Sequence, residues 1–64
     1  MDLHATVRLT EDLPEQNLRR GAVGVVVAIF DTPTRAYEVE FADAQGRTIV
    51  ELALREEQLE QVAL

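Results

Sequence analysis

Four residue types are absent from this 64-residue chain: cysteine, lysine, serine and tryptophan. Without cysteine the chain has no disulfide and no zinc–thiolate site. Because cysteine, serine and lysine are the usual enzyme nucleophiles, only threonine, tyrosine and carboxylates are left for such a role. Long apolar runs are also absent, since the longest covers residues 25–30, whereas a membrane-spanning helix needs about 20 residues.

The chain is short and acidic. Its length allows one domain over residues 1–64, with no room for a second core. Twelve acidic residues outnumber six arginines, for a formal net charge of −6, and such a surface disfavours binding to the phosphates of nucleic acids. The N-terminus lacks the basic start and apolar segment of a secretory signal. We therefore expect a cytoplasmic protein that does not associate with membranes.

Alternating apolar residues predict a chain of β-strands. Residues 5–9 form a first short strand, and residues 10–20 form a long polar loop that Leu13 and Leu18 are expected to fasten to the core. The apolar runs 21–30 and 37–41 flank a turn-rich segment, which is a β-hairpin signature. In the second run Tyr37, Val39 and Phe41 are expected to point inward. A further turn then leads into another alternating strand.

The C-terminal segment has two interpretations. Residues 51–64 are rich in strong helix formers, and propensity alone predicts a C-terminal helix. We favour a strand through Leu54, one helical turn over residues 55–59 and a short closing strand near residues 60–63. A further strand is needed to cover the sheet edge, and a barrel this small needs about five strands. The prediction is an all-β, five-stranded small barrel with a long first loop and a short helical turn before the last strand.

The strand over residues 23–30 is apolar at odd and even positions alike. We therefore expect it to be covered on both sides, with Val26 and Phe30 in the core rather than in an exposed patch. Gly24 inside the strand indicates either a bulge or a close backbone approach. Gly21, at the entry to the strand, suits a turn that needs a positive φ.

Motifs along nearly the whole chain resemble a family of small bacterial domains of unknown function. The resemblance implies an SH3-like barrel that occurs as a stand-alone protein. It also implies a gene beside other small uncharacterised proteins, as in toxin–antitoxin pairs. The residues that carry the resemblance are Val7, Leu9, Thr10, Asp12, Leu13, Pro14, Leu18, Gly21, Gly24, Val26, Val27, Tyr37, Glu38, Val39, Glu40, Phe41, Gly46 and Thr48.

A shorter stretch, from Gly21 through Gly24 to Val26, resembles the KOW-type segment of ribosomal and transcription-elongation proteins. That likeness implies contact with RNA. The only basic cluster that could serve it is Arg19 and Arg20, whereas KOW segments that bind RNA are usually basic.

No residue pattern indicates catalysis, a metal or a cofactor, and we expect none of the three. His4 is the only histidine, and a single imidazole without neighbouring ligands does not hold a metal. Glu38 and Glu40 share one face of a strand and can bracket a cation, but a solvated strand face explains them better.

An acidic face is the best candidate for a functional surface. Glu38 and Glu40 point outward from their strand, and Glu51 does so from the neighbouring strand. The apolar anchors are Leu13 and Leu18 in the first loop. Like charges on facing strands cost free energy unless solvent or a partner relieves them, so a basic protein is the expected partner.

Further acids extend this prediction, and other functions remain open. Glu56, Glu57 and Glu60 are expected on the same side as the acidic face. The expected function is a non-catalytic protein-interaction module, antitoxin-like or accessory. The alternatives are a nucleic-acid-associated module that uses Arg19 and Arg20, and a structural homo-oligomer formed through the apolar strand or a free sheet edge.

Overall fold

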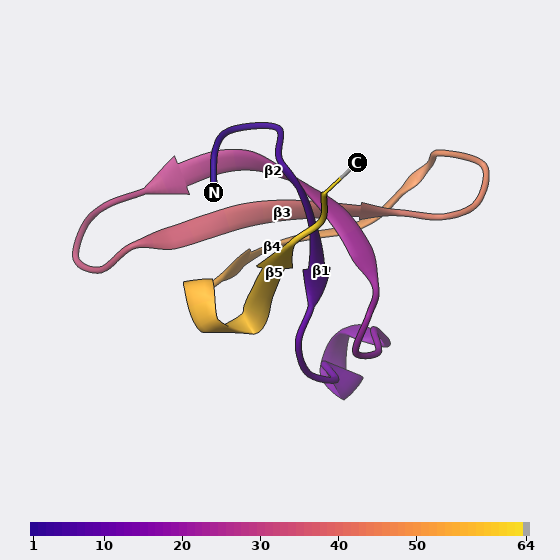
Figure 1. Cartoon of the computed structure of the whole chain (residues 1–64). Helices are drawn as coiled ribbons and strands as arrows, with labels where there is room; N and C mark the ends of the chain where they lie inside the picture. Colours follow the sequence, from indigo (N-terminus) through magenta and orange to yellow (C-terminus); the bar gives the residue numbers. More distant parts are fainter. Residues whose placement is uncertain (64) are drawn as a thin grey trace.

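A computed structural model describes residues 1–63 of the chain. Five strands and two single 3-10 turns follow one another (Figure 1). They are β1 (Thr6–Leu9), η1 (Pro14–Gln16), β2 (Val23–Phe30), β3 (Ala36–Ala42), β4 (Thr48–Leu54), η2 (Glu56–Gln58) and β5 (Leu59–Gln61). The all-β prediction with five strands, a long first loop and a short helical turn before the last strand is confirmed. None of the helical segments found in residues 1–63 is long and apolar enough to cross a membrane.

All five strands belong to one antiparallel sheet in the order β4-β3-β2-β1-β5. Figure 1 shows β1 and β5 running across the direction of β3, so the sheet curls around its core. The last strand pairs with β1, at the opposite end of the sheet from β4. The sheet therefore does not close into the barrel that the sequence predicted, and β4 and β5 are its two edges.

The core lies on the inner side of this curled sheet. Tyr37, Val39 and Phe41 point inward from β3, as predicted, and all three are buried. Their neighbours in the core are Val7, Leu9, Leu18, Val26, Leu54 and Leu59. Every strand thus contributes to one hydrophobic cluster.

The first loop is held by two leucines. The Leu13 and Leu18 backbones exchange hydrogen bonds in both directions, at 2.9 and 3.1 Å, and Leu18 is buried in the core. Pro14 begins η1 between them, where its missing N–H costs nothing. The two leucines therefore hold the loop against the sheet, as the sequence predicted.

Tertiary hydrogen bonds determine the conformation of the C-terminal segment. The buried Gln58 side chain accepts a hydrogen bond from the Arg55 backbone N–H at 2.9 Å, and the Gln58 carbonyl accepts one from Thr10 N–H at 3.0 Å. The Thr10 hydroxyl in turn donates to the Glu57 carbonyl at 2.9 Å. These bonds favour a single turn followed by β5 over the helix that propensity alone predicts.

The prediction that β2 is covered on both sides is wrong. Its pairing with β3 skips Val27, which forms a bulge between Val26 and Ala28. One extra residue reverses the alternation, so Val26 is fully buried, Ile29 packs against the core, and Phe30 turns outward with 47% of its surface exposed. The first half of the strand also leaves Val23 54% exposed.

Gly24 marks a close approach rather than the bulge. A Cβ at this position would lie 2.7 Å from Val39 Cγ1 and 2.8 Å from the Glu40 carbonyl oxygen, closer than real side chains pack. The sequence allowed either a bulge or a close backbone approach at this glycine, and the structure shows the close approach. Gly21 has the expected positive φ, at 91°.

Candidate functional site

Three glutamates form a row on the outer face of the sheet, which we call the acidic row: Glu38 and Glu40 of β3 and Glu51 of β4. The β3 residues between and beside them are buried, so alternation turns the glutamates outward. Glu40 is the register partner of Glu51, and Glu38 lies diagonal to Glu51, opposite Ala53. The structure thus brings together the three residues that the sequence singled out.

Partial burial and a neighbouring carboxyl group change the titration of Glu38. Partial burial raises the pKa of Glu38, and the neighbouring Glu51 carboxyl raises it further through hydrogen bonding and charge repulsion. The acidic row therefore holds a carboxyl group that ionises less readily than an isolated one. A cation brought to this surface would relieve that repulsion.

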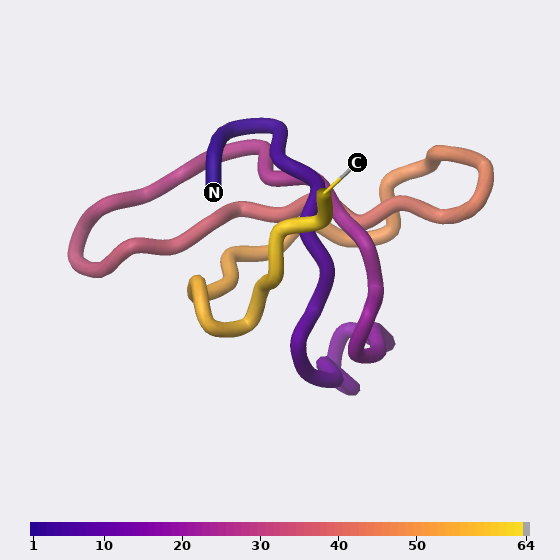
Figure 2. Tube along the Cα trace, viewed as in Figure 1, coloured from indigo at the N-terminus to yellow at the C-terminus, as the bar shows by residue number. Residues whose placement is uncertain are grey.

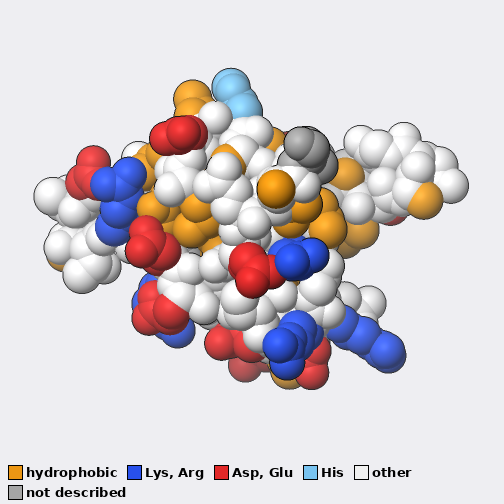
Figure 3. All heavy atoms as spheres, viewed as in Figure 1, with side chains coloured by type: hydrophobic (Ala, Val, Ile, Leu, Met, Phe, Trp, Pro, Cys, Tyr) orange, Lys and Arg blue, Asp and Glu red, His pale blue; other side chains and the backbone are white. Residues whose placement is uncertain are grey.

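The ion pairs among residues 1–63 leave the acidic row alone. They join Arg8 to Glu60, Arg35 to Asp31, Arg47 to Asp43 and Arg55 to Glu57. Each lies outside the row, and four of the six arginines of the chain are used in them. Figure 3 shows acidic and basic side chains intermixed around η2 and the first loop. The acidic row instead has no cation of its own within this part of the chain.

Apolar residues of β2 border the acidic row. Val25 is the register partner of Glu40, and Ala28 is the partner of Glu38. Because of the bulge, Phe30 shares this outer face with Val25, and both side chains are exposed. The sequence interpretation missed this border, since it treated β2 as an unbroken alternation; the run of consecutive apolar residues was the only available signal.

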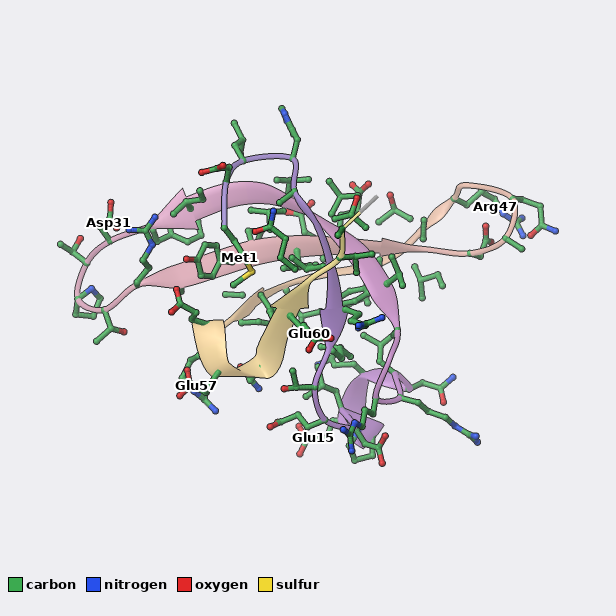
Figure 4. The ribbon with its side chains drawn as sticks, in the orientation of Figure 1. Met1, Glu15, Asp31, Arg47, Glu57 and Glu60 are labelled. Carbon is green, nitrogen blue, oxygen red and sulfur yellow. The ribbon has the colours of Figure 1, made fainter. Side chains whose placement is uncertain are left out.

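Two expected additions to this surface are wrong. Leu18 lies in the core and offers no surface to a partner. Figure 4 places Glu57 on η2, the turn that follows the end of β4, and Glu60 on β5, at the opposite end of the sheet from β4. Each is held by an arginine, Glu60 at 2.6 Å and Glu57 at 3.2 Å, and the Tyr37 hydroxyl donates to Glu56 at 3.0 Å.

Leu13 has a different place from the one expected. It is half-buried and lines a groove of about 380 Å³ whose other wall is Leu52, Ala53 and Leu54 of β4. The groove lies on the inner side of β4, whereas the acidic row lies on its outer side. Leu13 is thus separated from the acidic row by the edge strand itself.

The two arginines named for nucleic-acid contact are exposed in the first loop. The Arg20 backbone N–H donates to the Asp12 carboxylate at 2.8 Å, which anchors the loop. A polar cavity brings Arg20 near Arg8, but Arg8 is already paired with Glu60. Arg8 is therefore not available to extend the basic cluster of Arg19 and Arg20.

His4 lies in an exposed turn with a positive φ of 68°. Its backbone N–H donates to the Val26 carbonyl at 2.7 Å, so the residue ties the N-terminal segment to β2. Within residues 1–63, no three side chains among histidine, aspartate and glutamate gather closely enough to hold a metal ion.

Comparison with known proteins assigns the chain to a family. No curated protein and no solved structure matches it. The family model described as "Domain of unknown function (DUF4926)" matches residues 3–61, which is nearly the whole chain and every strand of the sheet. The protein therefore belongs to this small-domain family of unknown function, as the sequence resemblance implied.

Proposed function

We propose that this protein is a non-catalytic interaction module that binds a basic protein partner through the acidic row. The observation that supports this is the convergence of Glu38, Glu40 and Glu51 on one exposed sheet face without an arginine among them. Neighbouring like charges cost free energy in the unbound protein. A cationic partner converts that cost into attraction, and the field of the row steers the partner inward.

The apolar border gives the same surface a second component. Val25 and Phe30 flank the acidic row and are exposed. Interfaces commonly combine apolar contacts, which supply affinity, with complementary charges, which supply specificity and association rate. We expect the partner to place apolar side chains on this border and lysine or arginine side chains on the glutamates.

The fold type of the domain and the origin of its partner are also part of this proposal. We describe the domain as SH3-like, supported by its five antiparallel strands, its long first loop and the 3-10 turn before the last strand. The partner is a protein encoded by a neighbouring gene, and the role is antitoxin-like or accessory. The small size, the acidic charge and the shape of the surface support a protein that binds another protein rather than one that acts on a small molecule.

Charge reversal tests the proposed function. The tagged protein is used to isolate its partner from native lysate treated with nuclease, and the affinity of the purified pair is then measured by calorimetry. Glu38→Arg combined with Glu40→Arg is expected to weaken binding by about tenfold or more at low salt, because attraction becomes repulsion. High salt should weaken the wild-type complex.

A matched control separates the position of charge from its amount. Asp2→Arg combined with Glu60→Arg changes the net charge equally at exposed sites outside the acidic row and outside the groove, since Glu60 lies on β5 at the opposite end of the sheet from β4. This control is expected to keep most of the affinity. An unchanged affinity in the Glu38/Glu40 variant, or an equal loss in the control, contradicts the proposal. Recovery of RNA that nuclease abolishes would instead favour the arginines of the first loop.

A further inference from the structure

The outer edge of β4 has backbone groups without partners. Hydrogen bonds show toward which neighbouring strand the backbone N–H and C=O groups of a residue point. Val26 N–H donates to the Ala5 carbonyl at 3.0 Å, and the Val26 carbonyl accepts from His4 N–H at 2.7 Å. The Val26 backbone therefore faces β1. Neighbouring residues of a strand direct their N–H and C=O groups to opposite sides, so Val25 faces β3, and its register partner Glu40 faces β2.

The same alternation continues into β4. Since Glu40 faces β2, Val39 faces β4 and pairs with Leu52, which must face β3. Glu51 and Ala53 then direct their backbone groups away from the sheet. No backbone or side-chain partner for these groups is found among residues 1–63. The free edge ends at Arg55, whose N–H is taken by the Gln58 side chain.

The groove described above runs along this edge. Leu13 and Pro14 of the first loop form its far wall, and Leu52 and Leu54 form the near wall. A strand added to β4 would direct the side chain opposite Leu52 into the groove. Its neighbours on either side, opposite Glu51 and Ala53, would emerge on the outer face, beside the acidic row.

We propose that the free edge of β4 binds an extended segment of the partner in which arginine or lysine alternates with an apolar residue. This inference rests on the proposed function and specifies how its partner is recognised. The apolar side chain enters the groove beside Leu52, the two flanking cations contact the acidic row, and the backbones of Glu51 and Ala53 complete a ladder with the segment.

Charge complementarity selects this occupant over a second copy of the chain. Symmetric pairing of two β4 strands would place two acidic rows on one continuous sheet face, with each molecule already at a formal net charge of −6. A basic segment instead meets the row with opposite charge. Unpaired strand edges bind other strands readily, so the acidic row also protects this edge from self-association.

The test uses the whole protein and the acetylated, amidated peptide Arg-Val-Arg-Val-Arg, with the amide signals of the protein followed by NMR. Binding is expected to protect the Glu51 and Ala53 amides from hydrogen exchange. Ala53→Pro removes one edge donor and is tolerated because that N–H has no partner in the fold. This variant is expected to weaken binding about tenfold.

The opposite edge supplies a matched control. Thr6 accepts a hydrogen bond from Val62 N–H, so alternation directs Gln61 N–H to the free side of β5. Gln61→Pro therefore places the same residue on an edge that the peptide does not use, and affinity is expected to stay unchanged. A peptide N-methylated on the amides that face β4 keeps its side chains and charge but is expected not to bind.

The outcomes separate this inference from the proposed function. If Ala53→Pro binds the peptide like the wild type while the Glu38/Glu40 charge reversal abolishes binding, strand addition is overturned and the acidic row stands. Failure of the wild type to bind the peptide also overturns strand addition, and the partner isolated from lysate still decides the proposed function. If the Glu51 and Ala53 amides become protected without peptide as concentration rises, the occupant is a second copy, and the basic segment is overturned.

Discussion

The effect of the acidic row on protonation is most directly measured at Glu38. Its outward position on β3 is ordinary for a solvated strand. Its surroundings are not, because burial and the Glu51 carboxyl together raise its pKa. Protons bind to this site more tightly in the folded protein than in the unfolded chain. That difference links the stability of the domain to pH.

The sign of the linkage follows from the raised pKa. As pH rises from the ordinary value of 4.5 through the raised folded value, the folded state loses its proton later than the unfolded chain, so Glu38 lowers the free energy of unfolding across that window. Glu38→Gln removes this loss. The gain in stability of this variant over the wild type is therefore expected to be larger at pH 7 than at pH 4. Urea denaturation at the two pH values measures the difference.

Glu15→Gln removes one negative charge from the exposed first loop and controls for net charge. This variant is expected to leave the change in the free energy of unfolding between pH 4 and pH 7 close to that of the wild type. An equal effect of the two substitutions would mean that Glu38 is not special and that only total charge matters. A Glu38 carboxyl titrating below 4.5 by NMR would contradict the crowding of the acidic row.

At the scale of one element, the bulge in β2 has the largest consequence. It places Ile29 against the core and Phe30 on the outer face, next to the acidic row. A strand without the bulge would exchange the two side chains, because a shift of one residue reverses every later position. Phe30 therefore belongs to the apolar border because of a single extra residue, Val27.

Truncation of the two side chains tests this assignment. Ile29→Ala is expected to lower the free energy of unfolding by about 2 kcal/mol, the low end for a core aliphatic residue, because Ile29 is half-buried. Phe30→Ala removes a larger side chain but is expected to cost under about 1 kcal/mol, because Phe30 is exposed. Urea denaturation gives both values. A larger cost for Phe30→Ala would place Phe30 inside and leave Val25 as the exposed part of the apolar border.

At the scale of the whole molecule, the fold is a curled sheet with two free edges. Figure 2 shows the chain path, with the β2–β3 and β3–β4 loops at opposite sides of the molecule and β5 beside β1. The core is shared by all strands, yet the ends of the sheet do not meet. This open arrangement leaves the β4 edge available and sets it between the acidic row and the groove.

Hydrogen exchange in the free, dilute protein tests the open sheet. Along β4, the amides of Val50, Leu52 and Leu54 are expected to exchange slowly because they face β3, whereas those of Glu51 and Ala53 exchange fast. Strand β3 has neighbours on both sides, β4 and β2, and serves as an internal control, with every amide slow. Slow exchange at Glu51 and Ala53 in the dilute protein would show that the sheet is closed.

Much of this molecule was predictable from short-range patterns. Strict alternation of apolar and charged residues in β3 put Tyr37, Val39 and Phe41 inside, and the same alternation put Glu38 and Glu40 outside. Leu13 and Leu18 were correctly expected to hold the first loop. These predictions succeeded because each depends on the period of a strand or on the burial of an apolar side chain, which are local properties.

The sequence by itself determined the strand content, the inward face of β3 and the outward position of Glu38 and Glu40, because side chains two apart on a strand must share a face. Tertiary structure decided the rest. The bulge at Val27 depends on pairing with β3, the turn at Gln58 on hydrogen bonds to residues far away in the sequence, and the open β4 edge on the pairing of β5 with β1. Such long-range pairings compete with local propensity, and local sequence does not reveal which of them wins.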